Sequence, residues 1–192
     1  MTSKSGYIGA LSPEYALLGL LARQPDHGYE LHQRLVSELG HIWHITQSQV
    51  YNILKRLEAK GDISGELQPQ EKLPSRRFYR LTPTGQARFE AWLNTPTRPS
   101  VRAIRVEFLT RLYFLNLLDR EALEVLFQDQ EQEIQRGVTR LERLIAGLPP
   151  EQVFNRLSLD LRIRQLRSIQ EWLKDCRNHL IQQEHAHKED RV

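Results

Sequence analysis

The 192-residue sequence has almost no cysteine and no long apolar run. Its single thiol, Cys176, cannot form an internal disulfide or build a metal site alone, which fits a reducing compartment. Apolar runs extend for only a few residues, the N-terminus lacks a charged-then-apolar pattern, and the mean hydropathy is -0.54. We therefore expect no signal peptide, no membrane-spanning helix, no membrane partner and a cytoplasmic location.

Recognisable catalytic motifs are also missing. The sequence contains no nucleophile elbow, phosphate loop, HExxH helix or paired-cysteine motif. Several histidines lie near the N-terminus, but their spacing fits no closed metal motif: His27, His32, His41 and His44. We predict that the chain is not an enzyme and that it uses no cofactor and no metal.

The excess of positive over negative charge is small overall, but cations are concentrated in one region. The chain has 27 Lys and Arg against 24 Asp and Glu, a formal net charge of +3, which alone would not drive nucleic-acid binding. Cations nevertheless gather in a short stretch: Lys55, Arg56, Lys60, Lys72, Arg76, Arg77 and Arg80. A compact positive surface on a nearly neutral protein is therefore expected.

Residues 46–61 predict a helix with one buried face and one polar face. Thr46 can cap its first turn, and Gly61 can end it in a left-handed conformation. Apolar residues recur at steps of three and four, which buries one side: Val50, Ile53, Leu54 and Leu57. The other side carries groups suited to base edges and phosphates: Gln47, Ser48, Gln49, Asn52, Lys55, Arg56 and Lys60. This assortment favours DNA as the partner.

The surrounding segments predict a winged helix-turn-helix domain over residues 1–94. Shorter helices are expected at 13–23 and 29–39, and strands at 63–67 and 77–81 form a two-stranded wing. A further helix starts at Thr82 and ends near Leu93. The fold class is therefore mainly α, with three helices and a wing at its N-terminal end.

The second half predicts an all-α dimerisation domain. Residues 94–100 contain two prolines and no apolar anchor, which predicts a linker at 95–101. A helical domain is then expected at 102–183 and a flexible tail at 184–192. Helices of about 30 residues span roughly 45 Å, too long for this fold to bury alone, so a second copy is the expected partner. The expected dimer seam is Leu123, Phe127, Ile134, Leu159, Ile163, Leu166, Trp172 and Leu173.

An apolar cavity between the two domains is the expected effector site, because ligands favour domain interfaces. Its expected lining is Phe89, Trp92, Phe108 and Leu112. Nothing in the sequence names the small molecule.

Four motifs occur in order in the first half: 16–21 (ALLGLL), 27–31 (HGYEL), 48–61 and 77–85 (RFYRLTPTG). Together they resemble the PadR family of bacterial transcriptional regulators, and 107–114 (EFLTRLYF) resembles the opening of the helical domain of its longer members. The resemblance implies a homodimer joined through C-terminal helices, usually a repressor that binds an inverted repeat.

The resemblance also implies which residues contact DNA. It assigns this role to the helix face from Gln47 to Arg56, with the Tyr51 hydroxyl reaching phosphate, and to a wing tip comprising Ser75, Arg76 and Arg77. The family pattern usually has Gly-Thr-Leu-Tyr-Pro where this chain has Ser48 to Asn52. Asn52 in place of proline adds a side chain able to pair with adenine, so the preferred operator is expected to differ from that of better-known family members.

We predict a cytoplasmic, dimeric repressor that binds an inverted repeat in double-stranded DNA and is released by a small-molecule effector. One alternative is a winged-helix module that binds protein through the same helix and wing. A weaker alternative is a metal-responsive regulator that uses the histidines.

Overall fold

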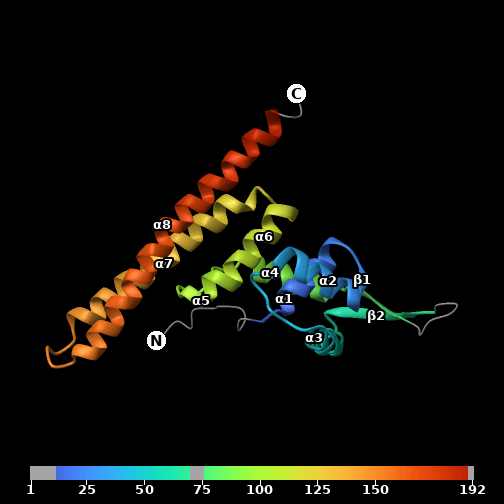
Figure 1. Ribbon diagram of the computed structural model, residues 1–192, viewed down its shortest axis with the longest axis horizontal. Coiled ribbons are helices and arrows are strands. Elements are labelled where there is room, and N and C mark those ends of the chain that lie inside the picture. The colour runs from blue at the N-terminus through green and yellow to red at the C-terminus, as the bar shows by residue number, and fades with distance from the viewer. Residues whose placement is uncertain (1–11, 70–75, 190–192) are drawn as a thin grey trace. The chain divides into compact units, whose positions relative to one another are not determined.

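The computed structural model describes residues 12–69 and 76–189 of the chain, which is mainly helical with one small antiparallel sheet (Figure 1). Contacts divide it into two compact units. The first unit runs to Thr95 and also includes Arg105–Arg120, and the second comprises Pro96–Ile104 and the chain from Glu121 onward. Among the described helices, none has both the length and the hydrophobicity that a membrane crossing needs.

The first unit opens with the helices that the sequence predicts. Helix α1 spans Glu14–Arg23, α2 spans Gly28–Leu39 and α3 spans Gln47–Ala59. Every residue of α1 from Glu14 to Leu21 is buried, so α1 forms the centre of the unit. Helix α2 is amphipathic and buries a leucine on each successive turn: Leu31, Leu35 and Leu39.

Helix α3 begins and ends as its sequence requires. The Thr46 hydroxyl accepts a hydrogen bond from the Gln49 amide at 3.3 Å, and the Gln49 side-chain oxygen accepts one from the Thr46 amide at 2.8 Å. This reciprocal pair is a capping box. At the other end Gly61 has φ of +75°, the one positive φ in the described part of the chain. The predicted apolar face is buried: Val50, Ile53, Leu54 and Leu57.

The sheet contains one strand that the sequence analysis did not predict. Strands β2 (Ile63–Gln68) and β3 (Arg76–Leu81) pair antiparallel as the wing, with Ile63 opposite Leu81. Strand β1, Asp26–His27, pairs with the other edge of β3 and gives the order β1-β3-β2. Two residues are too few to show the alternation that predicts a strand.

Helix α4 spans Pro83–Leu93 and is held against the turn after α3. The Thr82 hydroxyl accepts from the Gly85 amide at 3.1 Å and donates to the Asp62 carbonyl at 2.9 Å. A Cβ at Gly85 would lie 1.9 Å from that same carbonyl oxygen, so only glycine permits this approach. The turn after α3 is thereby fixed to α4.

Residues 105–120 belong to the same compact unit as the winged helix. Here α5 (Val101–Ala103) leads through a π-helical turn, η1 (Ile104–Phe108), into α6 (Leu109–Leu118). The Phe114 ring fits against Gly19 of α1, where a Cβ would lie 2.4 Å from it, and Trp43 donates to the Thr110 hydroxyl at 2.9 Å. This grouping differs from the expected boundary at residues 95–101, because the apolar face of α6 completes the core around α1.

The expected linker is anchored within the second unit. Thr97 is fully buried, and its amide and carbonyl both bond the Gln130 side chain, each at 2.9 Å. Pro99 lies against Gly137, where a Cβ would be 3.0 Å from the proline ring. The segment is therefore held in place by hydrogen bonds to a buried glutamine and by a proline contact.

The second unit is built on α7 (Ala122–Ala146) and α8 (Val153–Glu189), which lie side by side and are joined by a short turn (Figure 1). This pairing corrects the expected dimer seam. Six of its residues are buried within one copy of the chain and cannot face another: Leu123, Phe127, Ile134, Ile163, Leu166 and Leu173. Leu159 is half-buried, whereas Trp172 keeps 37% of its surface exposed.

Candidate nucleic-acid interface

The first turns of α3 present a polar surface to solvent. Because Val50, Ile53 and Leu54 fix the buried side, the residues between them must face outward. Gln49 and Arg56 are exposed as well and are described below. The other outward residues of these turns are Gln47, Ser48, Tyr51, Asn52 and Lys55, all exposed. We name these five residues the reading face.

Gln49, which is predicted to contact DNA, also caps its own helix in the structure. Its side-chain oxygen is bonded to the Thr46 amide and so belongs to the helix cap. The signal was present in the sequence, because Thr46-Gln47-Ser48-Gln49 has the spacing of a capping box.

Arg56 and Lys60 point toward the start of α1. Arg56 Nη2 lies 3.4 Å from Glu14 Oε1, and Lys60 Nζ lies 3.2 Å from Glu14 Oε2. Burial alone would raise the pKa of the Glu14 carboxyl, but hydrogen bonds from Arg88 and Lys60 outweigh it and hold that pKa below its ordinary value. Glu14 therefore carries a negative charge that these cations share.

Arg88 of α4 completes this group. It donates to Glu14 Oε2 at 2.7 Å, bonds the buried Asp62 carboxylate, and lies over the Tyr15 ring at 5.1 Å. Desolvation opposes the charge of Arg88, but its two carboxylate partners raise its pKa above the ordinary value. We name the five charged side chains the Glu14 cluster: Glu14, Arg56, Lys60, Asp62 and Arg88.

The wing is tied to α3 by Arg77. Its guanidinium lies 2.5 Å from Glu58 Oε1, which also accepts from the Gly65 amide of β2 at 3.2 Å. Arg76 is exposed, with Glu30 at 3.6 Å. Ser75 lies outside the described residues. Of the predicted wing contacts, Arg76 and Arg77 are both exposed and each has an acidic partner, which is closer for Arg77.

A cleft lies between the start of α2, α3 and β3. Its volume is about 490 Å³, and its lining is His27, Gly28, Tyr29, Tyr51, Arg76, Arg77 and Tyr79. Tyr51 reaches it by lying against Gly28, where a Cβ would be 2.6 Å from the tyrosine ring. Hydroxyl and guanidinium groups in one cleft suit a phosphate. His27 and Tyr29 were not predicted to belong to this surface, although both lie in the HGYEL motif.

The expected effector lining is mostly solid core. Trp92 is stacked on Tyr15 at 4.6 Å, lies under the Arg111 guanidinium at 4.6 Å, and donates to Glu107 at 3.2 Å. Desolvation lowers the pKa of Arg111 to about 10, against the opposing effect of Glu107. Phe108 and Leu112 are also buried. This corrects the expectation that these side chains line a cavity together.

A cavity does occur within the first unit, among α1, α4 and α6. It has a volume of about 440 Å³. Its lining is Ala22, Gln86, Phe89, Glu90, Leu93, Asn94, Leu115, Leu118 and Asp119. Phe89 alone comes from the expected set.

The histidines do not gather into a metal site. In the described part of the chain, no group of three or more His, Cys, Asp or Glu side chains could hold a metal ion. His27 bonds the Arg77 carbonyl at 3.3 Å, and His32 bonds the Ile45 carbonyl at 3.3 Å.

This chain is similar to known transcriptional regulators. The model of the transcriptional regulator PadR-like family matches residues 17–91, and that of the virulence activator alpha C-terminal domain matches residues 104–180. The negative transcriptional regulator PadR of Bacillus subtilis is 32% identical over 141 residues, which cover 71% of this chain and 77% of that protein.

Two solved structures of Bacillus subtilis PadR are also similar. The complex with operator DNA is 26% identical, with 87% of this chain and 98% of that chain covered and a TM-score of 0.44. The complex with p-coumaric acid is 26% identical, with 88% and 98% covered and a TM-score of 0.39. These relatives are transcriptional regulators, a non-enzymatic function, as the sequence predicted for this chain. The shared motifs, the matched family model and the curated relative together show that the chain belongs to the PadR family of transcriptional regulators.

Proposed function

We propose that this regulator is a homodimeric repressor that binds an inverted repeat through two copies of α3 and its wing, and that a small molecule releases it. The observation that carries the proposal is the reading face, an exposed polar surface on a capped helix beside a cleft suited to phosphate. The Bacillus subtilis relative, a negative regulator, supports repression. Such a protein acts in the cytoplasm, where its operator lies.

The reading face and the cleft divide the work of binding. Gln47, Ser48 and Asn52 carry the amide and hydroxyl groups that bond base edges in the major groove. Lys55, Tyr51 and Arg76 supply a cation, a hydroxyl and a guanidinium for phosphates, and Tyr29 lies in the same cleft as Tyr51. Base contacts then specify the sequence, and phosphate contacts fix the register.

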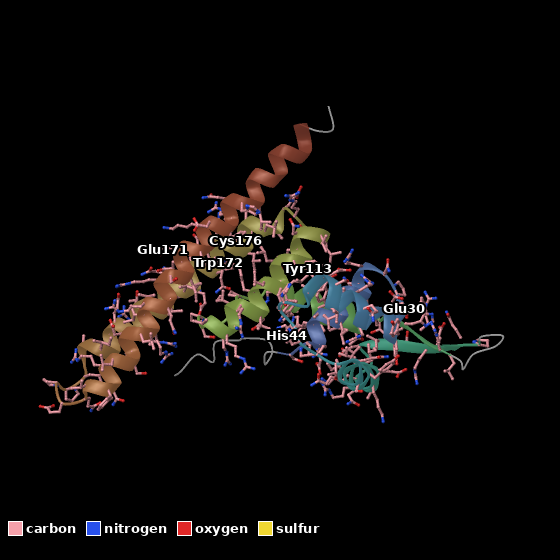
Figure 2. The ribbon with its side chains drawn as sticks, in the orientation of Figure 1. Glu30, His44, Tyr113, Glu171, Trp172 and Cys176 are labelled. Atoms are coloured by element: carbon pink, nitrogen blue, oxygen red, sulfur yellow. The ribbon has the colours of Figure 1, made fainter. Side chains whose placement is uncertain are left out.

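A second copy would bind along the exposed apolar face of α8. Phe154 is 86% exposed, Leu157 58% and Leu161 56%. Trp172, labelled with Cys176 on α8 in Figure 2, follows Phe154 by 18 residues, about five helical turns, so it lies on the same face. This face is opposite the side that packs on α7 through Ile163 and Leu166. A two-fold dimer carries two copies of α3, which matches the two-fold symmetry of an inverted repeat.

The cavity among α1, α4 and α6 is the proposed effector site. Its volume of about 440 Å³ is within the range of small-molecule pockets. Leu93, Leu115 and Phe89 supply apolar surface, and Glu90 and Asp119 supply polar groups. A ligand here would touch α4, which holds the turn after α3 through Thr82, so it could change the angle of α3.

The test is capture of genomic fragments by the purified protein at several salt concentrations, followed by sequencing. An enriched inverted repeat, with affinity that falls as salt rises, is expected. Duplex binding without any enriched repeat would remove the operator proposal. Absence of salt-dependent duplex binding would remove DNA as the partner.

A further inference from the structure

The Glu14 carboxylate forms ion pairs with two cationic side chains of α3, the proposed DNA-binding helix. It is the first residue of α1, and only 9% of its side chain is exposed. Arg56 donates to its Oε1 at 3.4 Å, and Lys60 donates to Oε1 at 3.4 Å and to Oε2 at 3.2 Å. These two cations lie four residues apart, one helical turn, at the C-terminal end of α3.

Both cations are also within reach of solvent. The Arg56 side chain is 56% exposed and the Lys60 side chain 50%. A DNA phosphate and the Glu14 carboxylate are competing acceptors for the same groups, because each is an anion with oxygen atoms that accept charge-assisted hydrogen bonds. The carboxylate has an advantage, since it is held in place and its burial weakens solvent screening.

Arg56 and Lys60 share Glu14 with a third cation, Arg88. Arg88 already bridges Glu14 and Asp62 and joins α1 to α4 and to the turn after α3. The cluster contains three cations and two acids, so Arg56 and Lys60 bring more positive charge than the acids need. Their arrangement around Glu14 therefore has a consequence for binding as well as for packing.

We infer that Glu14 is a positioning residue that restrains DNA affinity by keeping Arg56 and Lys60 off the phosphates. The inference rests on α3 being the helix that enters DNA. Affinity for random duplex is set largely by the number of phosphates that the protein neutralises. With two cations of α3 held by Glu14, Lys55 and the wing provide most of that contact, and base contacts on the reading face decide where the protein binds.

The test is the isosteric substitution Glu14→Gln, with binding to a random duplex measured between about 50 and 200 mM salt. Each added phosphate contact steepens the dependence of log affinity on log salt by about 0.9. One or two added contacts would make the fall in affinity over that range roughly threefold to twelvefold larger than in the wild type. Affinity at low salt is expected to rise as well.

A double-mutant cycle separates this role from a structural one. In the wild-type background, Arg56→Gln with Lys60→Gln should leave the salt slope nearly unchanged, whereas in the Glu14→Gln background the same pair should abolish the gain. Glu38→Gln is the matched control, because Glu38 is a partly buried carboxylate of the same unit whose partners are Arg23, Arg34 and Tyr113, none of them on α3. Its slope should equal that of the wild type.

An unchanged slope in folded Glu14→Gln protein would overturn the inference, and so would a slope lowered by about 0.9 to 1.8 when Arg56 and Lys60 are replaced in the wild type. If Glu14→Gln does not fold, the second comparison decides alone. Failure of the wild type to bind any duplex would instead reject α3 as a DNA-binding helix, and the inference with it.

Discussion

Replacing two leucines on the exposed face of α8 should separate the proposed dimer. The perturbation is Leu157→Glu with Leu161→Glu. Both leucines project from the side of α8 away from α7, so the α7–α8 pair should remain folded. Glutamate is a good helix former, so α8 itself should persist.

The expected magnitude follows from the exposure of the two side chains. Leu157 is 58% exposed and Leu161 56%. Full burial of a leucine stabilises by about 1.5–3 kcal/mol, so burying the exposed half contributes about 1–1.5 kcal/mol. Four such side chains meet in a two-fold dimer, and their loss amounts to about 4–6 kcal/mol. The dissociation constant should therefore rise roughly 1,000-fold to 20,000-fold.

Analytical ultracentrifugation over a concentration series measures this change. Val36→Glu is the control, because Val36 is 50% exposed on α2 in the other unit and should leave the dissociation constant unaltered. A doubly substituted protein that dimerises as tightly as the wild type would show that this face does not join the copies. A wild type that stays monomeric throughout would reject the dimer itself.

Three further predictions concern other parts of the chain. Gln130→Leu removes the two buried hydrogen bonds that join the Gln130 side chain to the Thr97 amide and carbonyl, so the free energy of unfolding in a denaturant titration should fall by about 1–3 kcal/mol. Gln132→Leu, at an exposed site on α7, should change it little. Glu14 and Glu38 have folded-state pKa values below 4.5, so their stabilisation is present above the unfolded-state pKa and is lost as pH falls through the folded-state pKa. The thermal midpoint should therefore drop as the pH falls below the ordinary glutamate pKa of about 4.3, and drop less in Glu14→Gln, with an equal drop in both proteins as the contrary result. Asn52→Ala should cost about 1–3 kcal/mol of base discrimination at one operator position, measured by competition with single-base variants, whereas Lys55→Ala should weaken all sequences alike.

Local sequence signals were sufficient to predict α1, α2, α3 and the wing. Three of these signals act within one or two helical turns, so they can be recognised from the sequence: a cap at Thr46, a left-handed glycine at Gly61 and regular apolar spacing. The capping role of Gln49 could also have been recognised from the sequence, but it was not predicted.

Interactions between residues that are distant in the chain could not be predicted from the sequence. Nothing near Arg56 or Lys60 indicates that they bond a carboxylate 42 and 46 residues earlier.

Periodicity had a second limit in the helical half of the chain. The apolar stripes of α7 and α8 predict that one face of each helix is buried, but not whether the covering helix belongs to the same chain. Leu123, Ile134 and Leu173 are covered by the chain's own hairpin. The linker prediction failed for a related reason, because a polar side chain on α7, Gln130, anchors Thr97. In both cases tertiary contacts decided an outcome that composition left open.

The length of the reading face links base recognition to dimerisation. From Gln47 to Lys55 the axis of α3 advances about 12 Å, so its side chains reach three or four base pairs at about 3.4 Å each. Two or three good base contacts give about 2–9 kcal/mol of discrimination, whereas specific regulators commonly need about 4–10 kcal/mol. The discrimination that one copy of α3 supplies is thus near or below what a specific regulator needs. Two copies double it, to about 4–18 kcal/mol, which covers that need. The variant with Leu157→Glu and Leu161→Glu should therefore keep salt-dependent binding to random duplex but lose most of its preference for the operator. An equal loss of affinity for the operator and for random duplex, measured by competition, would contradict this. It would show that dimerisation is needed to fold the reading face, and not to supply a second copy of it.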